Sequence, residues 1–101
     1  MKVTNFYDNK NQFIIEGEKG IYFQSYESIV AKIEKNGILK LGTDWDFSKT
    51  TLKYLYKFIE ENKNKLCNHL YNNLKNLTDV KNKKNYIQKL LNDGIIEEIE
   101  M

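Results

Sequence analysis

The chain has 101 residues, of which 41% are hydrophobic, and it carries a formal net charge of +2 at pH 7. This length and composition fit one folded domain and exclude a disordered chain or a second domain. The longest apolar runs are three residues, as in 13–15 and 21–23, which excludes a transmembrane helix of about 20 residues. The N-terminus turns polar before a signal-peptide core could form, so the sequence predicts a cytoplasmic protein.

The set of chemically active side chains is small. All 16 basic residues are lysine, arginine and proline are absent, and Cys67 and His69 are the single cysteine and histidine. A lone cysteine excludes an internal disulfide, and one thiolate with one imidazole cannot complete a four-ligand zinc site. Without guanidinium groups the chain cannot make bidentate contacts to guanine. We therefore expect no cofactor and no metal site.

The first 47 residues have the alternation and the β-branched and aromatic enrichment of a sheet. The five expected strands are Val3–Tyr7, Gln12–Glu16, Ile21–Ser25, Ile29–Glu34 and Ile38–Leu41. The glycines of segment 17–20 predict one tight hairpin, and Asn36-Gly37 predicts a second hairpin with a type I′ turn. In that second hairpin, the residues expected to face the core are Ile29, Ala31, Ile33, Leu39 and Leu41.

From residue 48 the hydrophobic period becomes helical. A first helix is expected over 48–62, capped by Asp46 or Ser48. The stripe expected to face the core consists of Leu52, Leu55, Tyr56 and Ile59. Further helices are expected over 63–76 and 80–92, with Gly94 ending the last one. The tail 95–101 fits a short strand or a helical end.

These elements predict a single α+β domain over residues 1–101. A short antiparallel sheet of two hairpins forms the half at 1–47, and it packs against two or three helices in the half at 48–101. The helical half holds most of the lysines, whereas the last five residues hold three glutamates. The expected architecture therefore combines a nearly neutral sheet with a cationic helical layer.

Lysines at 49, 53 and 57 form a stripe along the first expected helix. This stripe fits a solvated helix side first, and the alternative is an electrostatic footprint for nucleic acid or for an acidic protein. If the third helix lies alongside, Lys81, Lys83 and Lys84 extend the same patch. The sequence itself does not decide whether they do.

No catalytic group can be assigned. Cys67 and His69 are two residues apart on an expected helix, so their side chains point in different directions. Asp44 and Asp46 flank Trp45, and they fit either a contact to a cation or basic partner, or helix capping around a core tryptophan. No glycine-rich phosphate loop precedes a helix. The expectation is therefore that the protein is not an enzyme and acts by binding.

Two segments carry a family resemblance. Residues 25–31 read Ser-Tyr-Glu-Ser-Ile-Val-Ala, and residues 45–55 read Trp-Asp-Phe-Ser-Lys-Thr-Thr-Leu-Lys-Tyr-Leu. This pattern resembles a small domain of phages, plasmids and other mobile elements of low-GC Gram-positive bacteria, and the chain is similar to anti-CRISPR proteins of that setting. The resemblance implies stoichiometric binding of a Cas9-type nuclease in the cytoplasm of the host bacterial cell. Binding would block guide or target nucleic acid, or nuclease activation.

For this function, exposed aromatic side chains beside charges are the expected anchors. The predicted partner-binding residues are Asp44, Lys53, Tyr54, Lys57 and Phe58. The alternative function is a Lys-rich nucleic-acid-binding module of a phage or plasmid that contacts guide RNA or DNA through its helices. No membrane contact is expected, and the oligomeric state stays open.

Overall fold

The computed structural model describes residues 1–101 as a six-stranded sheet with helices on one side. The strands are β1 (Lys2–Phe6), β2 (Asn9–Gly17), β3 (Gly20–Ser25), β4 (Ser28–Glu34), β5 (Leu39–Gly42) and β6 (Glu97–Ile99). The helices are α1 (Lys49–Asn62), α2 (Asn68–Leu74) and α3 (Lys83–Asn92), with single 3-10 turns at Lys63–Lys65 and Leu77–Asp79. The predicted α+β fold is confirmed.

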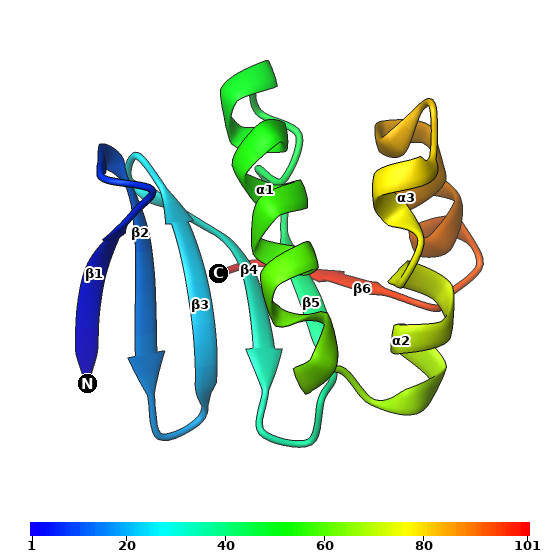
Figure 1. Ribbon diagram of the computed structural model, residues 1–101, viewed down its shortest axis with the longest axis horizontal. Coiled ribbons are helices and arrows are strands. Elements are labelled where there is room, and N and C mark those ends of the chain that lie inside the picture. Colours follow the sequence, from blue (N-terminus) through cyan, green and yellow to red (C-terminus); the bar gives the residue numbers. More distant parts are fainter.

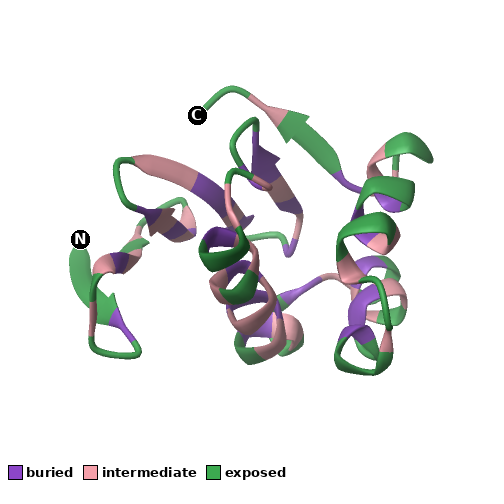
Figure 2. Ribbon diagram, turned by 90° about the horizontal axis from the view of Figure 1, so that it is seen from above, coloured by how far each residue is buried: buried purple, intermediate pink, exposed green.

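The strands lie in sequence order, and all neighbours are antiparallel except β5 and β6, which are parallel. Of the two possibilities for the tail, the strand is the one formed, and it adds a sixth strand to the expected sheet. Two parallel neighbours need a long crossover connection, and here that connection contains all three helices. As a result α1 lies across the middle of the sheet with α2 and α3 beside it (Figure 1), and the opposite face of the sheet carries no helix (Figure 2).

Both glycine-containing hairpins form, although one turn differs from the prediction. At the β4–β5 turn Gly37 has φ +87°, but Asn36 does not have a positive φ, so the turn is not type I′. The Gly37 amide donates to the Glu34 carbonyl, which makes a type I turn followed by a left-handed glycine. A Cβ on Gly37 would lie 2.4 Å from the backbone nitrogen of Cys67. The glycine thus allows the start of α2 to pack on this hairpin.

The expected core face of β4 is wrong at one residue. Ala31 and Ile33 face the core opposite Leu41 and Leu39, as predicted. Phe23 of β3 pairs with Ala31, but its neighbour Gln24 pairs with Ile29. The bulge turns Val30 into the core and leaves Ile29 partly exposed.

Helix α1 buries a face rotated from the predicted stripe. Its buried residues are Thr51, Leu55, Phe58, Ile59 and Asn62, whereas Leu52 and Tyr56 are only partly buried. The expected helix over 63–76 is interrupted, because the backbone is extended at Leu66 and Cys67 and the Cys67 amide donates to the Gly37 carbonyl. Helix α3 ends as predicted, with Gly94 at φ +75° after the last turn.

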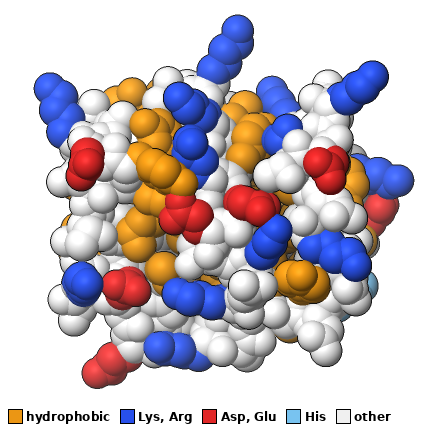
Figure 3. All heavy atoms as spheres, in the orientation of Figure 1, with side chains coloured by type: hydrophobic (Ala, Val, Ile, Leu, Met, Phe, Trp, Pro, Cys, Tyr) orange, Lys and Arg blue, Asp and Glu red, His pale blue; other side chains and the backbone are white.

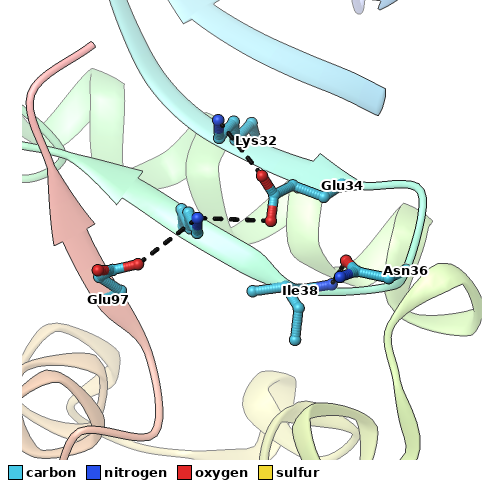
Figure 4. A network of polar contacts seen from close by, with 6 residues as sticks. Lys32, Glu34, Asn36, Ile38 and Glu97 are labelled. Atoms are coloured by element: carbon cyan, nitrogen blue, oxygen red, sulfur yellow. Dashed lines mark hydrogen bonds and ion pairs between the residues drawn. The ribbon is translucent and has the colours of Figure 1, made fainter. Parts of the chain in front are cut away.

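The face of the sheet without helices holds a chain of ion pairs that links its last three strands. Lys40 of β5 lies 3.5 Å from a carboxylate oxygen of Glu34 and 3.6 Å from one of Glu97, and Lys32 lies 3.5 Å from Glu34 (Figure 4). These side chains come from β4, β5 and β6. The lysines and glutamates offset each other, so this part of the sheet presents little net charge.

Candidate functional site

The structure separates the five predicted partner-binding residues. Phe58 is 0% exposed and stacks on Phe23 with ring centroids 5.8 Å apart. The prediction that it is an exposed anchor is therefore wrong. The physical reason is the rotation of α1, because Phe58 lies three residues after buried Leu55 and seven after buried Thr51, on the same helix face.

Three of the five predicted partner-binding residues, Lys53, Tyr54 and Lys57, lie beside the β1–β2 turn. The Tyr54 ring is half-buried, 6.3 Å from the ring of Tyr7, and its hydroxyl accepts a hydrogen bond of 3.1 Å from Asn9 Nδ2. Lys57 Nζ lies 4.5 Å from the centre of the Tyr7 ring, and Lys53 Nζ lies 5.8 Å from that of Tyr54. We call Tyr7, Lys53, Tyr54 and Lys57 the tyrosine–lysine cluster.

Asp44 lies elsewhere, in the loop between β5 and α1, where it accepts a hydrogen bond of 3.0 Å from Ser28 Oγ. Trp45 beside it is 2% exposed, which confirms its interpretation as a core residue. Ser48 is the residue that caps α1, since its Oγ accepts from the Thr51 amide at 3.1 Å. Asp46 instead lies 3.8 Å from Lys84 Nζ.

The start of the third helix does lie beside the start of the first, and together they line a shallow, open groove of about 430 Å³. Five lysines line this lysine groove, namely Lys49, Lys53, Lys81, Lys83 and Lys84. The first two come from the start of α1, and the other three come from the segment that leads into α3. The lysines before and in α3 therefore extend the lysine patch of α1, as expected if the two helices lie side by side. Lys57 is not part of this patch. Figure 3 shows lysine side chains gathered along the upper part of the molecule, where both helices begin.

All charged side chains that line the lysine groove are positive. Neither α1 nor α3 has an acidic residue in its first turn, although the positive end of a helix dipole normally favours acids there. Lys49 and Lys83 are instead the first residues of the two helices. Lys84 has a partner in Asp46, and Lys83 Nζ donates to the Val80 carbonyl at 2.9 Å. Two dipole ends and five cations thus combine into a positive field that an anion would relieve.

The wall of the lysine groove is formed by Leu52 and Tyr56. Both were expected in the core, and the helix rotation moves them to this side. Burial raises the pKa of the Tyr56 hydroxyl above its usual value, which already lies well above neutral. The hydroxyl is therefore protonated at neutral pH and can donate a hydrogen bond. The lysine spacing predicted the cations of this site, whereas nothing in the sequence marked its apolar wall.

The segments that carry the family resemblance hold the β3, β4 and α1 elements together. Ser25 Oγ and Thr51 Oγ1 are buried and hydrogen-bonded at 3.0 Å, so they join β3 to α1. Ala31 and Leu55 are fully buried in the same core. Packing therefore explains the buried residues of these segments, whereas Tyr26 and Phe47 of the same segments are exposed.

Cys67 is partly buried at the N-cap position of α2, where its side chain makes no capping hydrogen bond, and His69 is exposed. No three histidine, cysteine or acidic side chains lie together in a way that could hold a metal ion. None of the helices is both long and apolar enough to span a bilayer.

Comparison with known proteins identifies one relationship. No curated protein and no solved structure matches the chain. A family of unknown function, DUF8033, matches residues 1–73, a span that contains strands β1 to β5, helix α1 and most of α2. Helix α3 and strand β6 lie outside the matched residues. Because the match covers most of its length, the chain belongs to the DUF8033 family.

Proposed function

We propose that this protein is a binding module without catalytic activity that holds the phosphate backbone of a nucleic acid in the lysine groove. The observation that carries the proposal is the convergence of five lysines from two chain segments on one groove at the start of two helices. Cations at these positions oppose the helix dipoles in the free protein. A bound phosphate backbone brings negative charge to the two helix N-termini, where the helix dipoles favour it.

The chemistry favours contact that does not depend on base sequence. Lysine ammonium groups are point charges on flexible stems, and without arginine the groove offers no guanidinium for a bidentate contact to guanine. Such contacts position a backbone and do not select its sequence. Leu52 and Tyr56 add an apolar wall on which a sugar or an unpaired base can pack. These features together support single-stranded RNA or DNA as the ligand.

The test is fluorescence anisotropy with labelled single strands and duplexes of mixed sequence. We expect binding that weakens steeply between about 50 and 200 mM salt. The variants Lys49→Gln, Lys53→Gln and Lys81→Gln should each weaken binding and each lower the slope of log K against log salt by about 0.7 to 0.9. Lys19→Gln is the matched control, because Lys19 is equally exposed but lies in the β2–β3 turn.

Two results would refute this function. One is binding that Lys19→Gln weakens as much as the groove variants do, which would indicate a diffuse charge effect. The other is the absence of any salt-dependent binding to strands or duplexes at low salt.

We further propose, from the motif resemblance, a Cas9-type nuclease as protein partner. The observation that favours a protein contact is the tyrosine–lysine cluster, because Tyr7 keeps 53% of its surface exposed while its ring packs against Tyr54 and Lys57. Rigid aromatic side chains beside charges are typical of protein interface anchors. The activity would be stoichiometric inhibition of the nuclease.

A DNA cleavage assay with several Cas9 proteins tests this partner. The purified protein is added at increasing ratios before or after guide loading, and inhibition should reach its maximum near equimolar amounts. Lys57→Ala should relieve inhibition, with Lys19→Ala as the matched control. No inhibition of any nuclease tested would count against the partner, and inhibition by trace amounts would count against a binding mechanism.

A further inference from the structure

A second hollow, of about 680 Å³, lies where the β3–β4 turn and the β5–α1 loop meet. It is on the other side of the start of α1 from the lysine groove, because Thr51 lines this hollow whereas Lys49 and Lys53 line the groove. Both sites are at the end of the molecule where α1 begins (Figure 1). We call this hollow the acid–aromatic pocket.

One wall of the pocket is a strained tyrosine. Tyr26 has φ +56°, and it follows Ser25, which pairs with Ser28 to close a two-residue β-turn. The first central position of such a turn is normally glycine, and a bulky residue there strains the backbone. The Tyr26 amide donates to the Asn11 carbonyl at 2.6 Å, and Gln24 Nε2 donates to the Tyr26 carbonyl at 2.7 Å. Backbone contacts thus hold the residue in this conformation.

Comparison with Tyr7 shows what is unusual about Tyr26. Tyr7 also has a positive φ in a β-turn, but its ring packs against Phe6 and Tyr54 and under Lys57. Those contacts offset the strain within the chain. The Tyr26 ring has no aromatic or cationic partner and is 45% exposed at the rim of the pocket. Phe47 on the same pocket is 73% exposed.

The charges around the pocket are mainly acidic. Glu27 and Asp44 line it together with one lysine, Lys10. Neither carboxylate belongs to an ion pair. The hydrogen bond from Ser28 fixes the Asp44 carboxylate, and the hydrogen-bonded hydroxyls of Ser25 and Thr51 add a polar lining.

We propose that the acid–aromatic pocket binds a basic side chain, arginine in preference to lysine, presented by a segment of a partner protein. Two accessible aromatic rings attract a cation through their faces, and two carboxylates without an ion-pair partner supply the opposite charge. A planar guanidinium stacks on rings and hydrogen-bonds to carboxylates at the same time, which an ammonium group does less well. The chain contains no arginine of its own to fill the site.

The experiment is an NMR titration that follows the ring signals of Tyr26 and Phe47. The probes are the N-acetyl methylamides of arginine, lysine and citrulline, because citrulline has the shape of arginine without its charge. Arginine should produce saturable shifts with a dissociation constant of about 1 to 10 mM, which is a usual strength for one side chain. Citrulline should bind at least about 10-fold more weakly, and lysine should lie between the two.

Variants locate the binding. Phe47→Ala should weaken arginine binding about 5-fold or more without lowering the melting temperature, since the ring is mostly exposed. Glu27→Gln combined with Asp44→Asn should also weaken it. Tyr26→Gly should raise the melting temperature by relieving the positive φ and still reduce binding. Lys19→Gln, in the β2–β3 turn, is the control and should leave arginine binding unchanged.

Three results would overturn the proposal. Citrulline binding as tightly as arginine would show that charge is not recognised. Lysine binding as tightly as arginine would overturn the preference for a guanidinium. Arginine shifts that are not saturable, or that persist in both Phe47→Ala and Tyr26→Gly, would show that the pocket is not the site.

Discussion

Trp45 Nε1 donates a hydrogen bond of 3.1 Å to Glu98 Oε1, which joins two residues that are 53 positions apart in the sequence. Trp45 lies just after β5, and Glu98 lies in β6 opposite Leu41. The indole is 2% exposed, so its N–H has little access to water. This bond therefore fixes the C-terminal strand to the point where the chain leaves the sheet and enters α1.

Replacing Glu98 by alanine should lower the free energy of unfolding by about 1 to 3 kcal/mol, because it leaves a buried N–H without an acceptor. Glu98→Gln keeps an acceptor oxygen, so its free energy of unfolding should fall markedly less. Urea unfolding followed by tryptophan fluorescence measures both variants. Equal losses in the two would show that the carboxylate charge matters more than the hydrogen bond.

The elements that could be predicted from the sequence are those whose signals are local. The alternation in β2 and β3, the glycines of the turns and the cap at Ser48 each depend on a few neighbouring residues. The pairing of β6 with β5 depends on contacts across the whole helical half, and three residues of strand carry almost no pattern of their own. The bulge at Val30 is likewise set by the opposite strand.

The candidate sites were predictable to the same extent. The lysines of both helices were visible as spaced charges, but only the packing of α3 beside α1 brings them to one groove. Phe58 was misplaced because α1 is apolar on more than one side, and the helix pattern alone did not show which aromatic faces the sheet. The acid–aromatic pocket depends on the backbone strain of Tyr26, which no sequence pattern signalled.

The burial of Phe58 has a direct consequence for stability. Phe58→Leu should lower the free energy of unfolding by about 1 to 2 kcal/mol, and Phe58→Ala by about 3 to 5 kcal/mol. Tyr54→Ala should have a smaller effect, because Tyr54 is only half-buried. Chemical denaturation distinguishes these cases. A Phe58→Ala variant as stable as the parent would mean that α1 does not pack on Phe23 in solution.

Gln12 is a buried side chain whose polar atoms have no partner within the protein. It is 0% exposed in β2, opposite Ser25, and neither Oε1 nor Nε2 makes a hydrogen bond. Gln12→Met keeps a similar volume and removes the unsatisfied groups, so it should raise the free energy of unfolding by about 1 kcal/mol. Thermal unfolding measures the change. A clear loss of stability would contradict the prediction and reveal a hydrogen-bond partner for the amide.

The raised pKa of Tyr56 predicts a contribution to alkaline unfolding. Burial disfavours the tyrosinate, so the folded state holds this proton at a higher pH than the unfolded state does. The contribution to stability is complete below the unfolded pKa of about 10 and is lost as the pH rises through the folded pKa. Tyr56→Phe should therefore be less sensitive than the parent to pH above about 10, as measured by urea midpoints. Absorbance at the tyrosinate band should show that the tyrosine with the raised pKa is missing from Tyr56→Phe.

Lys49 should affect stability and binding in opposite directions. As the first residue of α1 it places a cation at the positive end of the helix dipole. Lys49→Glu reverses that interaction and adds an acid four residues before Lys53, so it should stabilise the protein by about 0.5 to 1 kcal/mol. The same change removes a cation from the lysine groove and should weaken nucleic-acid binding by more than Lys49→Gln does. Melting curves at low salt and anisotropy titrations on the same samples test the pair of effects. A less stable Lys49→Glu variant would mean that the lysine stabilises the free helix, and the groove would then lose the electrostatic reason for binding an anion.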